Sequence, residues 1–234
     1  GADLPFDTVR DVAAEMGVEI HTHTEVTGIR IEHNRVVGIE TNRGSIACGK
    51  AMQAVAGMSS ELARMAGFRL PIRTIPLQAC VSEAVKPFLD PIIVSGSLHI
   101  YVSQSARGEL VMGGSTDPYP LYSTRSTLEF KEDLMMHMLE LFPFIGSLRV
   151  LRQWAGMADM TPDFSPVMGL TPVENYYIDA GWGTWGFKAT PVSGTCMAET
   201  VATGKPHRLC APFSLERFYD YAQVGEKGAA SVGH

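Results

Sequence analysis

The chain has 234 residues, a formal net charge of −6, 45% hydrophobic residues and 19% charged residues. These values are typical of a globular protein that buries a sizeable core in one large or two small domains. The acidic balance and the lack of a basic tract argue against a nucleic-acid partner. No apolar run reaches the roughly 18 residues of a membrane span, so no membrane partner is expected.

The four cysteines, Cys48, Cys80, Cys196 and Cys210, show no CxxC spacing. A metal site is therefore not expected, and in a chain of this length the thiols are predicted to be reduced. The first residues also lack the pattern of a signal peptide. Together these features favour a cytoplasmic protein.

Taken in chain order, residues 5–16 repeat apolar side chains at helical spacing and end at a glycine, which predicts a helix. A short strand is expected over residues 18–21. Alternating residues at 24–31 and 36–40 flank a polar turn and predict a hairpin. Residues 45–48 are expected to add a third strand after the next turn.

A short apolar strand is predicted over residues 51–56, followed by a helix from Gly57 to about residue 66. Ser59 or Ser60 is the expected N-cap of this helix. Gln53 departs from the pattern, because it places an amide in a strand that otherwise reads as buried and apolar.

Long alternating runs then predict an antiparallel sheet with one covered face. These runs are residues 72–82, 98–103, 109–113 and 148–158. A helix is predicted over residues 125–142, where Ser126 and Glu129 have the spacing of a capping box. Its expected buried face consists of Leu128, Met135, Met138, Leu139 and Phe142.

Residues 176–194, YYIDAGWGTWGFKATPVSG, read as a strand, a glycine-rich loop and a helix. Thr190 as N-cap and Pro191 at the first helical position predict that the helix begins there and ends at Gly204. Lys188 then lies in the loop, two residues before a helix N-terminus that favours anions. An ordinary glycine-rich connection with Lys188 in water explains these residues equally well.

Asp163 lies in a Pro/Gly-rich turn and is expected to cap that turn rather than to act in catalysis. Ser214 is the expected N-cap of a last short helix over about residues 215–222. Residues 225–234 are expected to be frayed.

Six segments in order together resemble the D-amino-acid-oxidase-type flavoenzymes, and among them the beta-subunit type of heterotetrameric sarcosine oxidases. The segments are VTGI at 26–29, LHIYVSQS at 98–105, GELVMGG at 108–114, PDFSPVMG at 162–169, GWGTWGFKATP at 181–191 and APFSLERF at 211–218. The resemblance extends over nearly the whole chain.

The resemblance implies an α+β fold. Residues 1–68 and 159–234 would form an α/β flavin-binding half, and residues 69–158 an antiparallel-sheet substrate domain with a covering helix. The first strand and helix of the chain are not joined by the G-x-G-x-x-G unit that opens a dinucleotide-binding fold. The flavin-binding half is therefore expected to be incomplete, to bind FAD weakly or not at all, and to be inactive without the remainder.

The resemblance also implies the site residues. The expected FAD-binding residues are Val26, Ala56, Gly57, Gly181, Gly183, Thr184, Gly186, Phe187 and Lys188. Lys188 matches the family lysine that binds the substrate carboxylate, and loop N–H groups would face the flavin edge where negative charge accumulates. Tyr101 and His99 are candidates for the amine pocket, although ordinary packing explains a strand tyrosine as well. Trp182 and Trp185 would either wall the flavin or pack as core aromatics.

The implied reaction is oxidation of sarcosine or a similar secondary amino acid to an imine by hydride transfer to FAD. The implied partners are further subunits of a hetero-oligomer, which would also carry FMN. Two alternatives stay open: a subunit of an opine, proline or cyanide-forming dehydrogenase, and a flavin-free assembly module. Monomeric relatives use a lysine above the flavin for oxygen activation, and the strand from Leu110 has no lysine, which is compatible with the dehydrogenase.

Overall fold

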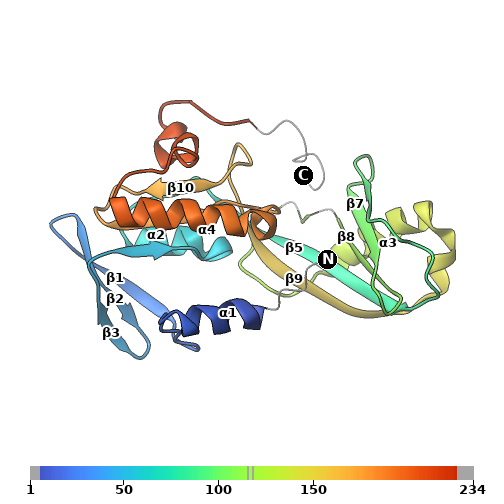
Figure 1. Ribbon diagram of the computed structural model, residues 1–234. Helices are drawn as coiled ribbons and strands as arrows, with labels where there is room; N and C mark the ends of the chain where they lie inside the picture. Colours follow the sequence, from blue (N-terminus) through green and yellow to red (C-terminus); the bar gives the residue numbers. More distant parts are fainter. Residues whose placement is uncertain (1–5, 115, 118, 226–234) are drawn as a thin grey trace.

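The computed structural model describes residues 6–114, 116–117 and 119–225 (Figure 1). Its helices are α1 (Phe6–Glu15), α2 (Ser59–Met65), α3 (Leu128–Leu141) and α4 (Gly186–Thr203), with 3-10 helices η1 (Ala56–Met58), η2 (Pro143–Ser147), η3 (Ala211–Phe213) and η4 (Leu215–Phe218). Its strands are β1 (Val26–Glu32), β2 (Arg35–Thr41), β3 (Gly44–Ala47), β4 (Ala51–Gln53), β5 (Arg73–Ala84), β6 (Ile93–Ser95), β7 (Ile100–Gln104), β8 (Glu109–Gly114), β9 (Val150–Met160), β10 (Val167–Leu170) and β11 (Tyr176–Ala180). The mixture of helices with parallel and antiparallel sheets confirms the predicted α+β class.

The largest sheet has five antiparallel strands in the order β6-β7-β8-β5-β9, as the alternating runs predicted. Its long strands β5 and β9 pair from Arg73↔Met160 to Ser82↔Val150. Figure 1 shows these two strands running from the part of the molecule that contains α2 and α4 to the part that contains β7, β8 and α3. Ile72, directly before β5, belongs to one hydrophobic core, and Cys80, toward the other end of β5, belongs to another.

Helix α3 covers one face of this sheet, but its start and its buried face differ from the prediction. Thr127, not Ser126, is the N-cap, and its hydroxyl accepts a hydrogen bond from the Phe130 N–H. The buried residues are Phe130, Leu134 and Met138, whereas the expected Leu128 and Leu139 are exposed, and Met135 and Phe142 are half-buried against the same core. Phe130, Leu134 and Met138 are spaced four residues apart and therefore share the face that packs into the core.

A second sheet has the order β10-β11-β4, with β4 parallel to β11. Gln53 is buried in β4, and both ends of its amide are paired: Nε2 donates to the Ser59 carbonyl and Oε1 accepts from the Tyr176 hydroxyl at 2.7 Å. A buried amide is tolerated when its hydrogen bonds are made. Gln53, which departs from the apolar pattern of its strand, therefore forms a polar link between β4, α2 and β11.

The third sheet, β1-β2-β3, confirms the predicted hairpin and third strand. The strand predicted over residues 18–21 is wrong, because these residues have no β pairing and follow the C-terminal turn of α1, where Val18 N–H donates to Ala13 O. Val18 and Ile20 favour strands, but a strand needs a partner for its backbone groups.

The predicted serine caps at α2 and at the last helix are also wrong. Helix α2 continues from η1 and starts without a side-chain cap; the Ser59 hydroxyl has no partner among the described residues, and Ser60 donates to Ile72 O. The last helix is the 3-10 turn η4, preceded by Ser214, which again makes no side-chain cap. Of the tail expected to be frayed, residues 226–234 lie outside the described residues.

Candidate active site

A cavity of about 1020 Å³ lies between the glycine-rich loop after β11 and the large sheet. The loop and the start of α4 contribute residues 182–188, and β5, β7 and β9 contribute Leu77, Tyr101 and Met157. The lining is largely apolar, with a few polar side chains that converge on the space. This combination is typical of small-molecule sites.

Helix α4 begins at Gly186, four residues before the predicted start at Thr190, and its N-cap is Trp185. The Thr190 hydroxyl donates to the Gly186 carbonyl instead of capping the helix. Pro191 lies inside the helix, which forgoes one internal hydrogen bond there because proline has no N–H. Lys188 consequently lies in the first helical turn rather than in the loop.

Lys188 lines the cavity, and its ammonium nitrogen lies 5.2 Å from the centroid of the Trp185 ring. At this distance the ring attracts the cation and restrains the long side chain. Of the described residues that line the cavity, Lys188 alone carries a positive charge. Since the free N–H groups of α4 start at the same place, this end of the cavity favours an anion.

The glycine loop is fastened to β9 by a carboxylate that the sequence reasoning missed. Gly181 and Gly183 have φ angles of +75° and +52°, a conformation that glycine adopts without strain. Their N–H groups donate to the Asp159 carboxylate, at 2.5 Å for Gly181 and 3.2 Å for Gly183. Asp159 is buried, and burial raises the pKa of its carboxyl, against the opposing effect of these backbone donors.

Asp159 was detectable in principle, as an acid at the end of an otherwise apolar strand. The N–H groups of the loop were expected to face the flavin. The Gly183 N–H, however, already donates to Asp159 and is not free for a ligand in this arrangement. A second acid of the cavity, Asp179, accepts hydrogen bonds from Trp182 Nε1 and from the Ser193 hydroxyl. Both carboxylates thus hold the loop.

Tyr101 lies in β7 and lines the cavity. Its ring extends across its cross-strand partner Gly113, where an added Cβ would lie 2.4 Å from the Tyr101 hydroxyl oxygen. Burial, and next the nearby Cys80, raise the pKa of the Tyr101 hydroxyl. Gly113 is therefore required for the close approach of this ring.

His99 lies outside β7, so the prediction of a strand that runs from residue 98 to residue 103 is wrong at this end. It lies in the turn between β6 and β7 with φ of +51°, and it does not line the cavity. The Ser95 hydroxyl accepts a hydrogen bond from the Leu98 N–H and tightens this turn. The local turn chemistry here overrides the alternation that suggested a longer strand.

The other predicted cofactor residues fall into two groups. Those that line the cavity are Ala56, Gly183, Thr184, Gly186, Phe187 and Lys188. Val26, Gly57 and Gly181 do not. Val26 opens β1, whereas Gly57 is buried beneath the cavity wall, where an added Cβ would lie 2.4 Å from Met157 Cβ.

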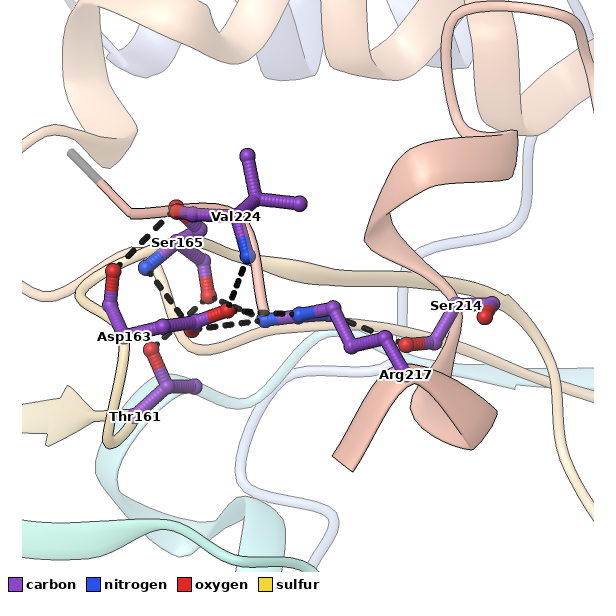
Figure 2. A network of polar contacts seen from close by, with 6 residues as sticks. All are labelled: Thr161, Asp163, Ser165, Ser214, Arg217 and Val224. Carbon is purple, nitrogen blue, oxygen red and sulfur yellow. Dashed lines mark hydrogen bonds and ion pairs between the residues drawn. The ribbon is translucent and has the colours of Figure 1, made fainter. Parts of the chain in front are cut away.

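A buried polar network joins the turn between β9 and β10 to η4 (Figure 2). The Arg217 guanidinium donates to both carboxylate oxygens of Asp163, at 2.8 and 3.0 Å, and to the Ser165 carbonyl. Asp163 also accepts from the Ser165 N–H, which confirms its expected role in the turn. The same turn packs against the loop, because a Cβ on Gly181 would lie 2.6 Å from the Thr161 methyl carbon.

Residues 7–200 match the family model described as DAO, FAD dependent oxidoreductase. The chain therefore belongs to this family of FAD-dependent oxidoreductases. The described helices are too short or too polar to cross a bilayer.

Individual relatives refine the comparison. The chain is 49% identical over 221 residues to sarcosine oxidase subunit beta of Rhodobacter capsulatus, which covers 94% of this chain and 53% of the relative. It is 46% identical to the Arthrobacter protein of the same name, covering 95% of this chain and 55% of that protein. The chain thus spans about half the length of these curated relatives.

Among solved structures, L-proline dehydrogenase from P. horikoshii superposes with a TM-score of 0.84 at 29% identity, over 93% of this chain and 60% of that one. Glycine oxidase from Geobacillus kaustophilus superposes with a TM-score of 0.78 at 24% identity, over 88% of this chain and 55% of that one. At this identity the similarity shows a shared fold and nothing further.

Proposed function

We propose that the protein containing this chain oxidises sarcosine or a similar secondary amino acid to an imine, with FAD as the hydride acceptor. The observation that carries the proposal is the position of Lys188, the one cation of the cavity lining among the described residues, beside the N-terminus of α4. An amino acid offers a carboxylate, which needs a fixed cation in a largely apolar site. The names of the sarcosine oxidase subunits that this chain resembles supply the substrate class.

The residues of the cavity fit a flat cofactor ring. Ala54, Ala56, Gly114, Gly183 and Gly194 present little or no side chain to the space, which lets a planar group approach the backbone closely. Trp182 and Trp185 line the same space. We assign FAD binding to this wall and to the first turn of α4, and we keep Val26, Gly57 and Gly181 as predicted contributors.

The flavin supplies the hydride acceptor, and the chain supplies position and charge. Lys188 binds the carboxylate of the amino acid and thereby fixes which carbon faces the cofactor. Leu77 and Met157 form part of the apolar side of the cavity, whereas Lys188 is solvent-exposed at its edge. Tyr101 bounds the amine pocket from β7. Residues 69–158 would then act as the substrate domain.

Further subunits and FMN belong to the same proposal, because the similar proteins are named as subunits. We also keep the cytoplasm as the proposed location. The second candidate is a dehydrogenase that passes electrons to a partner. It is supported by the 0.84 TM-score with a proline dehydrogenase and by the absence of lysine from β8.

The test uses the purified protein that contains this chain. A flavin absorbance band, together with reduction of that band by sarcosine under anaerobic conditions, is expected. No flavin band would favour the assembly module, and a band that sarcosine leaves unchanged would reject the proposed substrate. Turnover with an artificial acceptor but not with O₂ would select the dehydrogenase.

A further inference from the structure

Two cysteines and a histidine from one stretch of 15 residues meet where the chain turns back after helix α4. One ligand atom from each of Cys196, His207 and Cys210 lies within 4.8 Å of the others. Cys196 and Cys210 are buried, and His207 is half-buried. The sequence predicted no metal site because CxxC spacing is absent, but the turn after α4 produces the convergence that spacing alone does not show.

The fold holds this turn in place independently of any ion. Gly204 ends α4 in the left-handed conformation, with φ of +71°, and reverses the chain. The Thr200 hydroxyl then accepts a hydrogen bond from the His207 N–H at 3.0 Å, and the His207 carbonyl accepts from the Cys210 N–H at 2.8 Å. The backbone that presents the three side chains is therefore preorganised.

We propose that Cys196, His207 and Cys210 form a zinc site that fastens the segment after α4 to the helix. Two sulfurs and an imidazole nitrogen are ligands that Zn²⁺ prefers, at about 2.3 Å and 2.0–2.1 Å. Tetrahedral geometry with those bond lengths places neighbouring ligand atoms about 3.6–3.8 Å apart. The observed spacing needs only small side-chain rotations to reach this geometry.

Both ring nitrogens of His207 have neighbours in the metal-free chain. Its Nδ1 accepts a hydrogen bond from the Leu209 N–H at 3.2 Å, and zinc bound at Nδ1 would replace this hydrogen bond. Its Nε2 lies 3.7 Å from the Glu199 carboxylate. Metal-bound histidines usually donate their other N–H to such a carboxylate, which makes Glu199 a positioning residue for His207. The fourth ligand position is open to water.

The protonation balance is defined. Zinc binds the thiolate form of cysteine. When Zn²⁺ binds, each S–H bond breaks, both protons pass to solvent, and two thiolate–zinc bonds form. No oxidant or reductant takes part. The competing chemistry is a Cys196–Cys210 disulfide, which would require an oxidant.

The experiment measures zinc directly in the purified protein after dialysis against Zn²⁺ and then against metal-free buffer. About one zinc per chain is expected in the parent. Cys196→Ser, Cys210→Ser and His207→Asn should each lose it, and Glu199→Gln should bind zinc about tenfold or more weakly. Cys48→Ser is the matched control, because Cys48 lies at the end of β3, outside the cluster, and should retain the zinc.

A second measurement needs no variant. Replacement of zinc by Co²⁺ should give the intense near-ultraviolet absorption of thiolate–cobalt bonds, and two thiols should become unreactive toward a thiol reagent until a chelator is added. Absence of zinc, zinc that persists unchanged in the ligand variants, a cobalt spectrum without thiolate absorption, or a Cys196–Cys210 disulfide in the metal-free protein would each overturn the proposal.

Discussion

The Arg217 guanidinium and the Asp163 carboxylate form a two-pronged ion pair in which each side chain is only 2% exposed. Arg217 comes from η4 near the C-terminal end of the described chain, and Asp163 from the turn between β9 and β10 (Figure 2). The pair therefore joins the last helix to the turn that packs against Gly181. The remaining acceptor capacity of Asp163 is used by the Val224 and Ser165 N–H groups.

Breaking this pair should destabilise the protein strongly. Arg217→Met leaves a buried carboxylate without its counter-ion, and a loss of about 3–5 kcal/mol in the free energy of unfolding is expected from urea denaturation. The control is Glu174→Gln, which breaks the exposed pair with Arg35 and should cost about 1 kcal/mol or less. Equal effects of the two substitutions would contradict the structural role of the buried pair.

The same pair predicts how stability depends on pH. Burial alone would raise the pKa of Asp163, but the hydrogen bonds from Arg217 and from the Val224 N–H prevail and lower it. An acid with a lowered folded pKa stabilises the protein above its unfolded pKa, near 3.9, and loses this contribution as the pH falls through the folded value. The free energy of unfolding of Asp163→Asn should therefore fall less than that of the parent as the pH falls through the folded pKa of Asp163. Plots of this free energy against pH that have the same shape for parent and variant would refute the prediction.

Asp159 should act in the opposite direction. Burial raises the pKa of its carboxyl in the folded state, so ionisation is less favourable there than in the unfolded chain. Its contribution to the free energy of unfolding therefore falls as the pH rises from the unfolded value through the raised folded value. Denaturation of Asp159→Asn across this range should show a smaller decrease with pH than the parent, and parallel curves would count against the assignment.

Lys188→Met should weaken binding of the substrate carboxylate in the flavin-loaded protein. Loss of a charge-assisted hydrogen bond of about 1.5–3 kcal/mol corresponds to a fall in kcat/KM for sarcosine of roughly 10- to 150-fold, expected mainly in KM. The flavin spectrum should be retained. Lys205→Met, at an exposed position two residues after α4, should leave the kinetics unchanged. Unaltered kinetics in Lys188→Met would remove this residue from the site.

Gly57→Ala tests the packing beneath the cavity wall. The added Cβ would lie 2.4 Å from Met157 Cβ and 3.1 Å from the Met157 carbonyl oxygen, so η1 and β9 must separate. A loss of about 1–3 kcal/mol is expected in thermal or urea unfolding. Gly156→Ala, one residue earlier on β9, meets no atom within 4 Å and should be nearly neutral. A Gly57→Ala variant that is as stable as the parent would show that η1 and β9 can separate at little cost in free energy.

The sequence by itself determined the family, the α+β class, the hairpin of β1 and β2, the long strands of the large sheet and the order strand, loop and helix over residues 176–203. These features depend on local patterns, such as alternation and the order of motifs, that one stretch of chain contains completely. The tertiary structure decided the start of α4 at Gly186, the cap at Thr127, the turn position of His99 and the absence of a strand at residues 18–21. It also decided the roles of Asp159 and Arg217 and the meeting of Cys196 with Cys210. The roles of Asp159 and Arg217 come from hydrogen bonds and charges between residues distant in sequence, and such partners leave no local pattern to read. The Thr127 cap and the turn at His99 depend on hydrogen bonds between near neighbours, for which the sequence allows more than one arrangement until the chain packs.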